Sequence, residues 1–258
     1  MPIALTIAGS DSGGGAGIQA DLKTFAAHGV YGTSALTAVT AQNTRGVTAV
    51  HVIPIAMVRA QIDAVATDLR PAAVKIGMLA TADIIVEVSR ALDAHGLRPV
   101  VLDPVMVAKG GSRLLDPDAV DAMSMLLSRA AIVTPNLAEA EVMTGTEVRD
   151  RAAMERAART LVESGAGAAL VKGGHLDGGT VADILWTGRD LHVFESPRID
   201  TAHTHGTGCT LSSAIAAQLA LGRPIVEAVE AAIAYVRRAI ASAPGLGHGH
   251  GPLNHFPD

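Results

Sequence analysis

The feature that most constrains this chain is a regular alternation of short apolar, β-branched runs with longer Ala-rich segments along its 258 residues. Nine of the short runs have the length and composition of strands, and several are apolar throughout, which is typical of strands covered on both faces. They span residues 3–8, 35–40, 48–53, 73–77, 100–103, 131–134, 168–172, 181–186 and 191–195. The last two are joined by a four-residue turn containing Gly188, which predicts a hairpin.

Helical spacing of apolar residues fills most of the intervals between these runs. It predicts helices over residues 54–69, 81–95, 150–163 and 224–240, and a buried helix over the almost wholly apolar segment 209–221. The sequence shows no break in composition, no repeat and no long linker. We therefore expect one α/β domain over residues 1–258, with a mainly parallel central sheet and helices on both faces.

Composition narrows the class of protein. Hydrophobic residues make up 49% and charged residues 17%, which excludes a disordered chain. Aromatic residues make up only 2% and the net charge is −5, so we expect no nucleic-acid partner. The single cysteine excludes an internal disulfide, and no apolar run reaches the ~20 residues of a membrane span. The chain starts with a strand-like run without a basic segment before it, so we expect a cytoplasmic protein with no membrane partner.

Common nucleotide-binding and hydrolase motifs are missing. The glycine cluster at 13–17 follows the first strand, but Ile18 stands where a dinucleotide-binding fingerprint needs Gly or Ala. The sequence contains no Gly-Lys dipeptide for a P-loop, no Gly-x-Ser-x-Gly elbow and no His-Glu-x-x-His pair. What remains are glycine-rich turns at 13–17, 110–111, 173–174 and 206–208. Each is either a plain turn or a place where backbone amides approach a ligand.

The segment 204–210, Thr-His-Gly-Thr-Gly-Cys-Thr, precedes the predicted buried helix. Gly206 and Gly208 allow a tight turn around Thr207, and the helix start offers unpaired amides and a positive dipole end, which suit an anion. A thiol there, that of Cys209, is expected to have a lowered pKa. The alternative for Cys209 is an inert buried side chain.

This turn resembles the signature near the C-terminus of the ribokinase superfamily, whose last position is usually an Asp that acts as general base. Cys209 in that place, with His205 before the glycines, resembles the hydroxymethylpyrimidine and phosphomethylpyrimidine kinases of thiamin biosynthesis. Further blocks resemble the same branch from end to end, at residues 8–21, 37–43, 75–78, 103–106, 134–141, 171–175 and 251–255. The resemblance implies a ribokinase-like fold over essentially the whole chain.

The resemblance implies transfer of the γ-phosphoryl group of Mg-ATP to the hydroxyl of 4-amino-5-hydroxymethyl-2-methylpyrimidine, and then phosphorylation of the monophosphate. It also implies a homodimer, and it leaves room for a monovalent cation beside Mg²⁺. Two alternatives stay open: a pyridoxal or pyridoxine kinase, and a non-catalytic pyrimidine-binding regulator on the same fold. The presence of Asp103, Glu139 and the glycine turn, without any DNA-binding appendage, favours an enzyme.

Three polar positions follow predicted strands, at the edge where open α/β sheets bind ligands. Asp103 precedes Pro104, so it is either a magnesium ligand or a turn-capping residue. Asn136 and Glu139 resemble the Asn-x-x-Glu pattern of the superfamily, in which Glu orients the metal waters and Asn lies on the ATP side. Their spacing fits a helix capping box equally well.

Only four of the twenty positive side chains are lysines, which draws attention to each of them. Lys172 follows a strand and precedes two glycines, so it is expected to bind ATP phosphates together with Asn136 and Thr207. Lys109 lies in the loop 107–112, which is expected to cover the site. The alternative for both lysines is a solvated charge.

The amide of Gln42 offers a donor and an acceptor, which match the ring nitrogen and amino edge of an aminopyrimidine. The resemblance places Gln42 on the pyrimidine and Asp21 near the substrate hydroxyl. It adds to the substrate site a set of small and apolar residues: Gly9, Met78, Val105 and Val39. Core packing is the alternative for the apolar members, and it is favoured for Val39.

Overall fold

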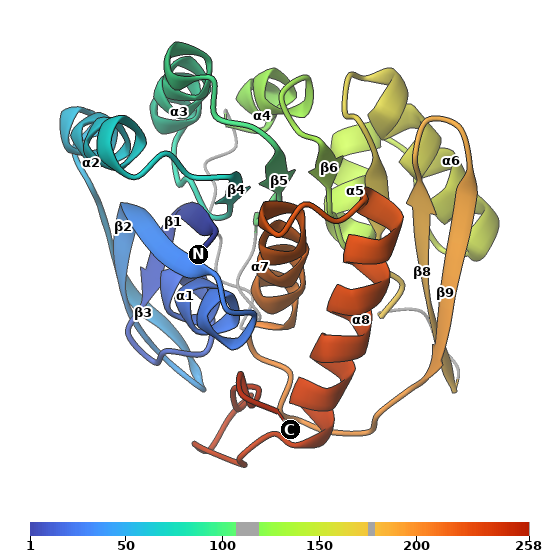
Figure 1. Ribbon diagram of the computed structural model, residues 1–258. Helices are drawn as coiled ribbons and strands as arrows, with labels where there is room; N and C mark the ends of the chain where they lie inside the picture. Colours follow the sequence, from blue (N-terminus) through green and yellow to red (C-terminus); the bar gives the residue numbers. More distant parts are fainter. Residues whose placement is uncertain (107–118, 175–178, 258) are drawn as a thin grey trace.

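In the computed structural model, which describes residues 1–106, 119–174 and 179–257, the nine predicted strands all form. They are β1 (Ile3–Asp11), β2 (Tyr31–Asn43), β3 (Gly46–Val52), β4 (Ala73–Ile76), β5 (Val100–Leu102), β6 (Ile132–Val133), β7 (Ala169–Val171), β8 (Thr180–Trp186) and β9 (Leu191–Pro197). They pair into one sheet in the order β3-β2-β1-β4-β5-β6-β7-β8-β9 (Figure 1). The pairs from β2 to β7 are parallel, whereas β3, β8 and β9 run antiparallel to their neighbours.

Two strands are longer than their apolar runs predict. β1 and β2 pair in parallel from Ile3 and Tyr31 as far as Asp11 and Thr40. β2 then continues in a hairpin with β3 to Asn43. Most of the extra residues are glycine or polar, so no apolar run predicts them, and they are recognised as strand only by their pairing. The extension brings the strand ends, with Asp11 and Gln42, to the wall of the cavity described below.

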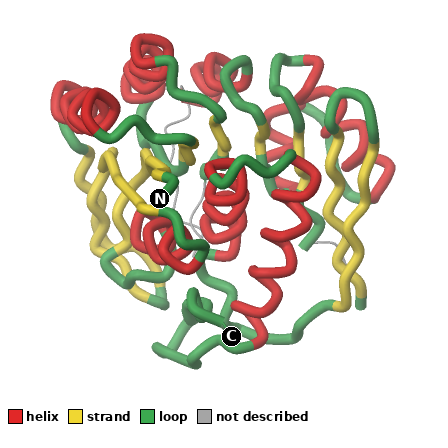
Figure 2. The backbone as a smooth tube through the Cα atoms, viewed as in Figure 1, coloured by secondary structure: helices red, strands yellow, loops and turns green. Residues whose placement is uncertain are grey.

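Helices cover both faces of the sheet, as predicted (Figure 2). They are α1 (Gly17–Ala27), α2 (Ile55–Asp68), α3 (Ala82–His95), α4 (Ala119–Leu127), α5 (Leu137–Thr144), α6 (Arg151–Glu163), α7 (Thr207–Ala220) and α8 (Ile225–Ala241). The predicted ranges do not include α1, α4 or α5. These helices are only 11, 9 and 8 residues long, too short for a helical spacing of apolar residues to stand out in the sequence.

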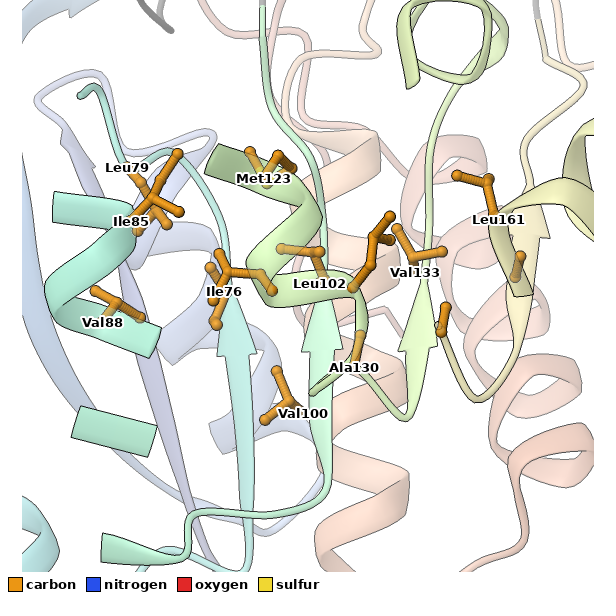
Figure 3. Packing of buried hydrophobic residues seen from close by; sticks show 14 of the residues in the cluster. Ile76, Leu79, Ile85, Val88, Val100, Leu102, Met123, Ala130, Val133 and Leu161 are labelled. Carbon is orange, nitrogen blue, oxygen red and sulfur yellow. The ribbon is translucent and has the colours of Figure 1, made fainter. Parts of the chain in front are cut away.

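Alternation along the buried strands divides the core into two layers. Val100 and Leu102 of β5 pack with α2, α3, α4 and α6, whereas Val101 packs with α1, α7 and α8. Figure 3 shows part of the first layer, where side chains of the central strands lie against those of the covering helices. Among the helices that the structure describes, none has the length and apolar character needed to cross a membrane.

The carboxyl ends of the parallel strands meet at one edge of the sheet, and α7 begins there. Asp103 follows β5 directly, Asn136 comes shortly after β6, and Lys172 follows β7. The fold thus brings the polar positions predicted after these strands to a single edge.

Candidate active site

A cavity of about 990 Å³ opens at the carboxyl edge of the sheet. Most of the predicted site residues line it: Gly9, Gln42, Met78, Asp103, Val105, Asn136, Glu139, Lys172, Gly206, Thr207, Gly208 and Cys209. The rest of its wall includes apolar residues of α8, such as Ile233 and Ile240. The volume is at the upper end of the range for small-molecule sites.

The glycine turn at 206–208 has the geometry of an anion site. Gly206 has φ +82°, and a Cβ atom on it would lie 1.8 Å from the carbonyl oxygen of Gly15, so only glycine fits. α7 begins at Thr207 without a side-chain cap, which leaves its first-turn amides directed at the cavity edge. A Cβ on Gly208 would lie 3.2 Å from Nζ of Lys172. The start of α7 and the Lys172 ammonium therefore lie next to each other on the cavity wall, where both favour an anion.

Cys209 lies in the first turn of α7, and its Sγ accepts a hydrogen bond from the backbone N–H of Gly17, the first residue of α1. Burial raises the pKa of its thiol to about 11, although the positive charge of Lys75 lowers it. The carboxylates of Asp21 and Asp103 raise this pKa further. The predicted lowering of the Cys209 pKa is therefore wrong for the free protein, because burial and two carboxylates outweigh the helix ends.

Asp103 and Glu139 are both almost fully buried and face Lys172. Nζ of Lys172 lies 3.1 Å from Oδ1 of Asp103 and 4.0 Å from Oε2 of Glu139. The Lys172 side chain is only 15% exposed, so the solvated-charge alternative is wrong for it. Burial raises the pKa of Glu139 to about 7, opposed by Lys172, and the neighbouring Asp103 raises it further.

The Asn-x-x-Glu spacing forms the capping box that is one of its two interpretations. The Asn136 side chain accepts the N–H of Glu139, and Oε2 of Glu139 accepts the N–H of Asn136 at 2.8 Å, which completes the capping box of α5. Asn136 and Glu139 nevertheless both line the cavity. The cap fixes where the Glu139 carboxylate stands, and the cavity leaves that group open to a ligand.

Asp103 and Glu139 suit a divalent cation in their chemistry, since both offer hard oxygen donors on the wall of the cavity. Within the part of the chain that the structure describes, no group of three or more His, Cys, Asp or Glu side chains surrounds a possible metal position. Mg²⁺ does not need such a cage, because it usually keeps several waters and binds substrate phosphates. The residues therefore fit Mg²⁺ held jointly with a nucleotide.

The opposite part of the cavity is formed by the ends of β1 and β2 and by the segment after β4. A Cβ atom on Gly9 would lie 3.0 Å from Sδ of Met78, so glycine leaves the space that Met78 fills. Gln42 is held by its backbone, where its N–H donates to the Ser12 hydroxyl. Met78 and Val105 supply apolar walls, as predicted.

Two predicted substrate residues do not face the cavity. Asp21 is completely buried in α1, and its carboxylate binds Lys75 and Ser213, so it supports the cavity floor from behind. Val39 is 42% exposed on the surface, because it lies between Ala38 and Thr40 on β2 and points to the opposite face. Both the substrate role and the core-packing alternative are wrong for Val39. Lys109 and the loop expected to cover the site lie outside the described residues.

Sequence reasoning assigned no role to three residues that line the cavity: Asp11, Lys75 and His205. Asp11 accepts the N–H groups of Gly13, Gly15 and Ala16, and so it shapes the first glycine turn. His205 binds Asp11 at 2.8 Å. The available signals were an Asp just before a glycine run and a His just before the second glycine turn.

Comparison with known proteins agrees with this geometry. Residues 11–254 match the family model described as phosphomethylpyrimidine kinase. A hydroxymethylpyrimidine/phosphomethylpyrimidine kinase of Rhizobium meliloti (strain 1021) is 56% identical over 98% of this chain and 97% of its own length. The chain belongs to the phosphomethylpyrimidine kinase family. It is therefore a phosphotransferase with the ribokinase-like fold that the sequence predicts.

Solved structures place two kinds of vitamin kinase close to this family member. A Bacillus subtilis pyridoxal kinase, determined as an ADP complex, has a TM-score of 0.93 and 40% identity and covers 100% of this chain and 98% of its own. A phosphomethylpyrimidine kinase of Clostridium difficile 630 has a TM-score of 0.84 and 45% identity, covering 93% and 100%. The overall shape is thus shared by kinases of both ring types.

Proposed function

We propose that this kinase transfers the γ-phosphoryl group of ATP to the hydroxyl of 4-amino-5-hydroxymethyl-2-methylpyrimidine, and that it then phosphorylates the monophosphate to the diphosphate. The observation that supports this proposal most strongly is a single cavity lined by two features. One is the side-chain amide of Gln42, which suits an aminopyrimidine, and the other is the uncapped N-terminus of α7 beside Lys172. The name of the Rhizobium meliloti relative supports this substrate class. One sheet contains all nine described strands, which supports a single kinase domain over residues 1–258.

The proposed chemistry is positioning and charge neutralisation, because phosphoryl transfer requires little covalent work from the protein. The substrate hydroxyl oxygen bonds to the γ-phosphorus, the bond to the ADP oxygen breaks, and the hydroxyl proton leaves. Gly206, Thr207 and Gly208 would hold the charge on the transferred group through backbone N–H groups. The nucleotide phosphates would be oriented by Lys172, Asn136 and Thr207. A monovalent cation could assist these residues in holding the phosphates. Mg²⁺ at Asp103 and Glu139 would neutralise phosphate charge.

Cys209 is the proposed acceptor of the hydroxyl proton. In the free protein its raised pKa keeps it a thiol at neutral pH. A loose transition state demands little base strength, so a small thiolate fraction suffices for this role. If Cys209 accepts the proton as a thiolate, turnover should increase with pH.

The experiment that tests the proposed function compares ATP-dependent phosphorylation of the hydroxymethylpyrimidine, its monophosphate and pyridoxal by the purified protein. We expect phosphate transfer to both pyrimidines. Gln42→Ala should raise the pyrimidine KM by roughly 5–150-fold and leave the ATP KM unchanged, since it removes hydrogen bonds worth about 1–3 kcal/mol. Asn43→Ala is the matched control, because exposed Asn43 does not line the cavity. The proposal is overturned if the protein transfers phosphate to neither pyrimidine.

A pyridoxal kinase activity is the second candidate. The specific observation in its favour is the higher TM-score of the Bacillus subtilis pyridoxal kinase, 0.93 against 0.84 for the Clostridium difficile enzyme. Pyridoxal also carries a hydroxymethyl group on an aromatic ring, but it lacks the aminopyrimidine edge. In the assay above, kcat/KM for pyridoxal equal to or greater than that for the pyrimidine would make it the main activity.

We also propose that the kinase is a cytoplasmic homodimer. Its need for ATP supports the location. Exposed apolar side chains on the edge strand β3 and the first turn of α2 support a second copy as partner: Val50, Val52, Ile55 and Met57. Sedimentation of the native chain should give twice the monomer mass, and Val50→Lys with Val52→Lys should give the monomer. A native monomer would contradict this.

A further inference from the structure

Four side chains form a continuous row along one wall of the cavity: Asp11, His205, Gln42 and Thr40. Nε2 of His205 lies 2.8 Å from Oδ2 of Asp11 and 3.4 Å from Nε2 of the Gln42 side-chain amide. Oε1 of the same amide lies 3.2 Å from Oγ1 of Thr40, so that the amide oxygen stands at the Thr40 end and the nitrogen at the His205 end. The two ends of an amide have nearly the same shape, so hydrogen-bond partners decide which end is oxygen and which is nitrogen.

Asp11 fixes the proton at the His205 end. Its carboxylate already accepts backbone N–H groups from Gly13 at 2.8 Å, Gly15 at 3.1 Å and Ala16 at 2.8 Å. Burial alone would raise its pKa, but the hydrogen bond from His205 and these N–H groups lower it overall. Asp11 is therefore an acceptor only, and Nε2 of His205 must carry a proton and donate it to Asp11. A protonated Nε2 has no lone pair to accept an N–H group of Gln42, so the amide oxygen is the better neighbour at this end, although the proton itself is held by Asp11.

Thr40 fixes the other end independently. Its hydroxyl proton is donated to the carbonyl oxygen of Ser10 at 2.8 Å. The lone pairs of Oγ1 then face Gln42, and they require an N–H group. The opposite amide orientation would set two N–H donors against each other at the His205 end, 3.4 Å apart, and would demand the single Thr40 proton twice. Both ends thus select the same orientation.

We propose that Asp11, His205 and Thr40 are positioning residues that lock the Gln42 amide with its oxygen toward His205 and its nitrogen toward Thr40. This inference rests on the proposed pyrimidine substrate. The free lone pair of the amide oxygen then accepts the 4-amino group, and the free N–H donates to ring nitrogen N3. The hydroxymethyl-bearing carbon C5 adjoins the amino-bearing carbon, and His205 precedes Gly206. This ring orientation therefore turns the hydroxymethyl group toward the glycine turn where phosphate is transferred.

The test uses a substrate with the reversed edge, 5-hydroxymethyl-2-methylpyrimidin-4-one, which presents a carbonyl oxygen and an N3–H group. With the amide locked, the native kinase should favour the amino substrate over the oxo analogue by roughly 10²-fold or more in kcat/KM. His205→Leu frees the amide to turn, so this ratio should fall to within roughly tenfold of one. His205→Gln keeps an N–H donor for Asp11 and should restore most of the ratio. The ratio compares two substrates in one variant, so a general loss of stability leaves it unchanged.

Thr40→Val tests the other end of the row without touching His205, and it carries the test if His205→Leu does not fold. Its matched control is Thr33→Val, which removes a buried hydroxyl bonded to the Ala4 carbonyl on the same pair of strands but away from the cavity. Thr40→Val should lower the ratio and Thr33→Val should not. An unchanged ratio in both His205→Leu and Thr40→Val overturns the inference.

Calorimetric affinities for the two rings separate this inference from the proposed function. If the native protein binds the amino ring selectively but transfers no phosphate, the kinase assignment fails and the amide lock stands. If it phosphorylates both rings with equal kcat/KM, the lock fails and the kinase assignment stands. If neither ring binds, both fail.

Discussion

Nζ of Lys75 lies 2.9 Å from Oδ2 and 3.0 Å from Oδ1 of Asp21, and both side chains are completely buried. The Thr6 and Ser213 hydroxyls donate to the same carboxylate at 2.6 Å each. Burial alone would lower the pKa of Lys75, but Asp21 raises it, so the lysine stays charged. The pair joins β4 to α1 and α7 directly beneath the cavity, on whose wall Lys75 lies.

The first prediction concerns the stability of this pair. Asp21→Asn leaves a buried ammonium without its counter-charge and should lower the free energy of unfolding by ~3–5 kcal/mol. Lys75→Met should have a similar effect, whereas the double variant should lose much less than the sum of the two. Urea unfolding measures all three, with exposed Asp68→Asn as a control that stays within ~0.5 kcal/mol of the parent. Additive losses would show that the two charges do not depend on each other.

The second prediction concerns the metal. Asp103→Asn and Glu139→Gln should each lower turnover and raise the Mg²⁺ concentration needed for half-maximal rate, with pyrimidine affinity nearly unchanged. Steady-state kinetics over a Mg²⁺ titration measures both effects. Gln can still accept the Asn136 N–H, so the cap of α5 should survive. A Glu139→Gln variant with lower thermal stability but intact kinetics would show that Glu139 only caps the helix.

The third prediction concerns Cys209. Cys209→Ala should keep the substrate affinities and reduce turnover by ~10²–10⁴-fold, the usual effect of losing a positioned base. Because the thiol pKa is raised to about 11, thiol alkylation of the free protein should be slow at neutral pH and accelerate tenfold per pH unit up to that value. Turnover should increase with pH in the same sense, and bound pyrimidine should protect the thiol. If the turnover of Cys209→Ala stays within a few-fold of the parent at every pH, Cys209 is not the base. The backbone of the glycine turn would then form the whole anion site.

The fourth prediction concerns acid stability. His255 is buried beside the Thr210 hydroxyl, and burial lowers its pKa to about 4, with Lys23 and His205 acting in the same direction. Because its folded pKa lies below the unfolded value of ~6.5, the stability due to neutral His255 is complete above that value. It is lost as the pH falls from about 6.5 to about 4, by up to ~3 kcal/mol. In His255→Gln, the free energy of unfolding should depend less on pH between about 4 and about 6.5 than it does in the parent. An unchanged dependence on pH would contradict this prediction.

The fold could be predicted almost completely because the information is local. Each buried strand is a short apolar run, and each long helix shows its apolar face in its own sequence. The ends of the strands could also be predicted as binding positions, which is why Asp103, Glu139 and Lys172 were found. The wrong assignment of Val39 to the substrate site could have been avoided from the sequence. Val39 lies three residues from Gln42 on one strand, so the two side chains point to opposite faces.

The remaining errors come from contacts between distant segments. The pairing of Asp21 with Lys75 depends on how α1 packs over β4, which no local pattern encodes. The pKa of Cys209 depends first on burial and then on the charges of Lys75, Asp21 and Asp103, all of which arise only in the folded protein. A lone cysteine before a helix predicts a reactive thiol until those neighbours are known.

The close contact between Gly15 and Gly206 joins opposite ends of the chain, since neither glycine tolerates a side chain against the other turn. His205 makes the same connection through Asp11, and its backbone N–H donates to the carbonyl of Gly251. During synthesis, β1 and the first glycine turn leave the ribosome long before the second turn exists. A nascent chain can therefore form its central strands early, but the cavity wall that contains both glycine turns is complete only when nearly all of the chain has been made. A fragment that ends before residue 204 lacks the second glycine turn and the N-terminus of α7, so we expect the substrates to stabilise it much less than the full chain.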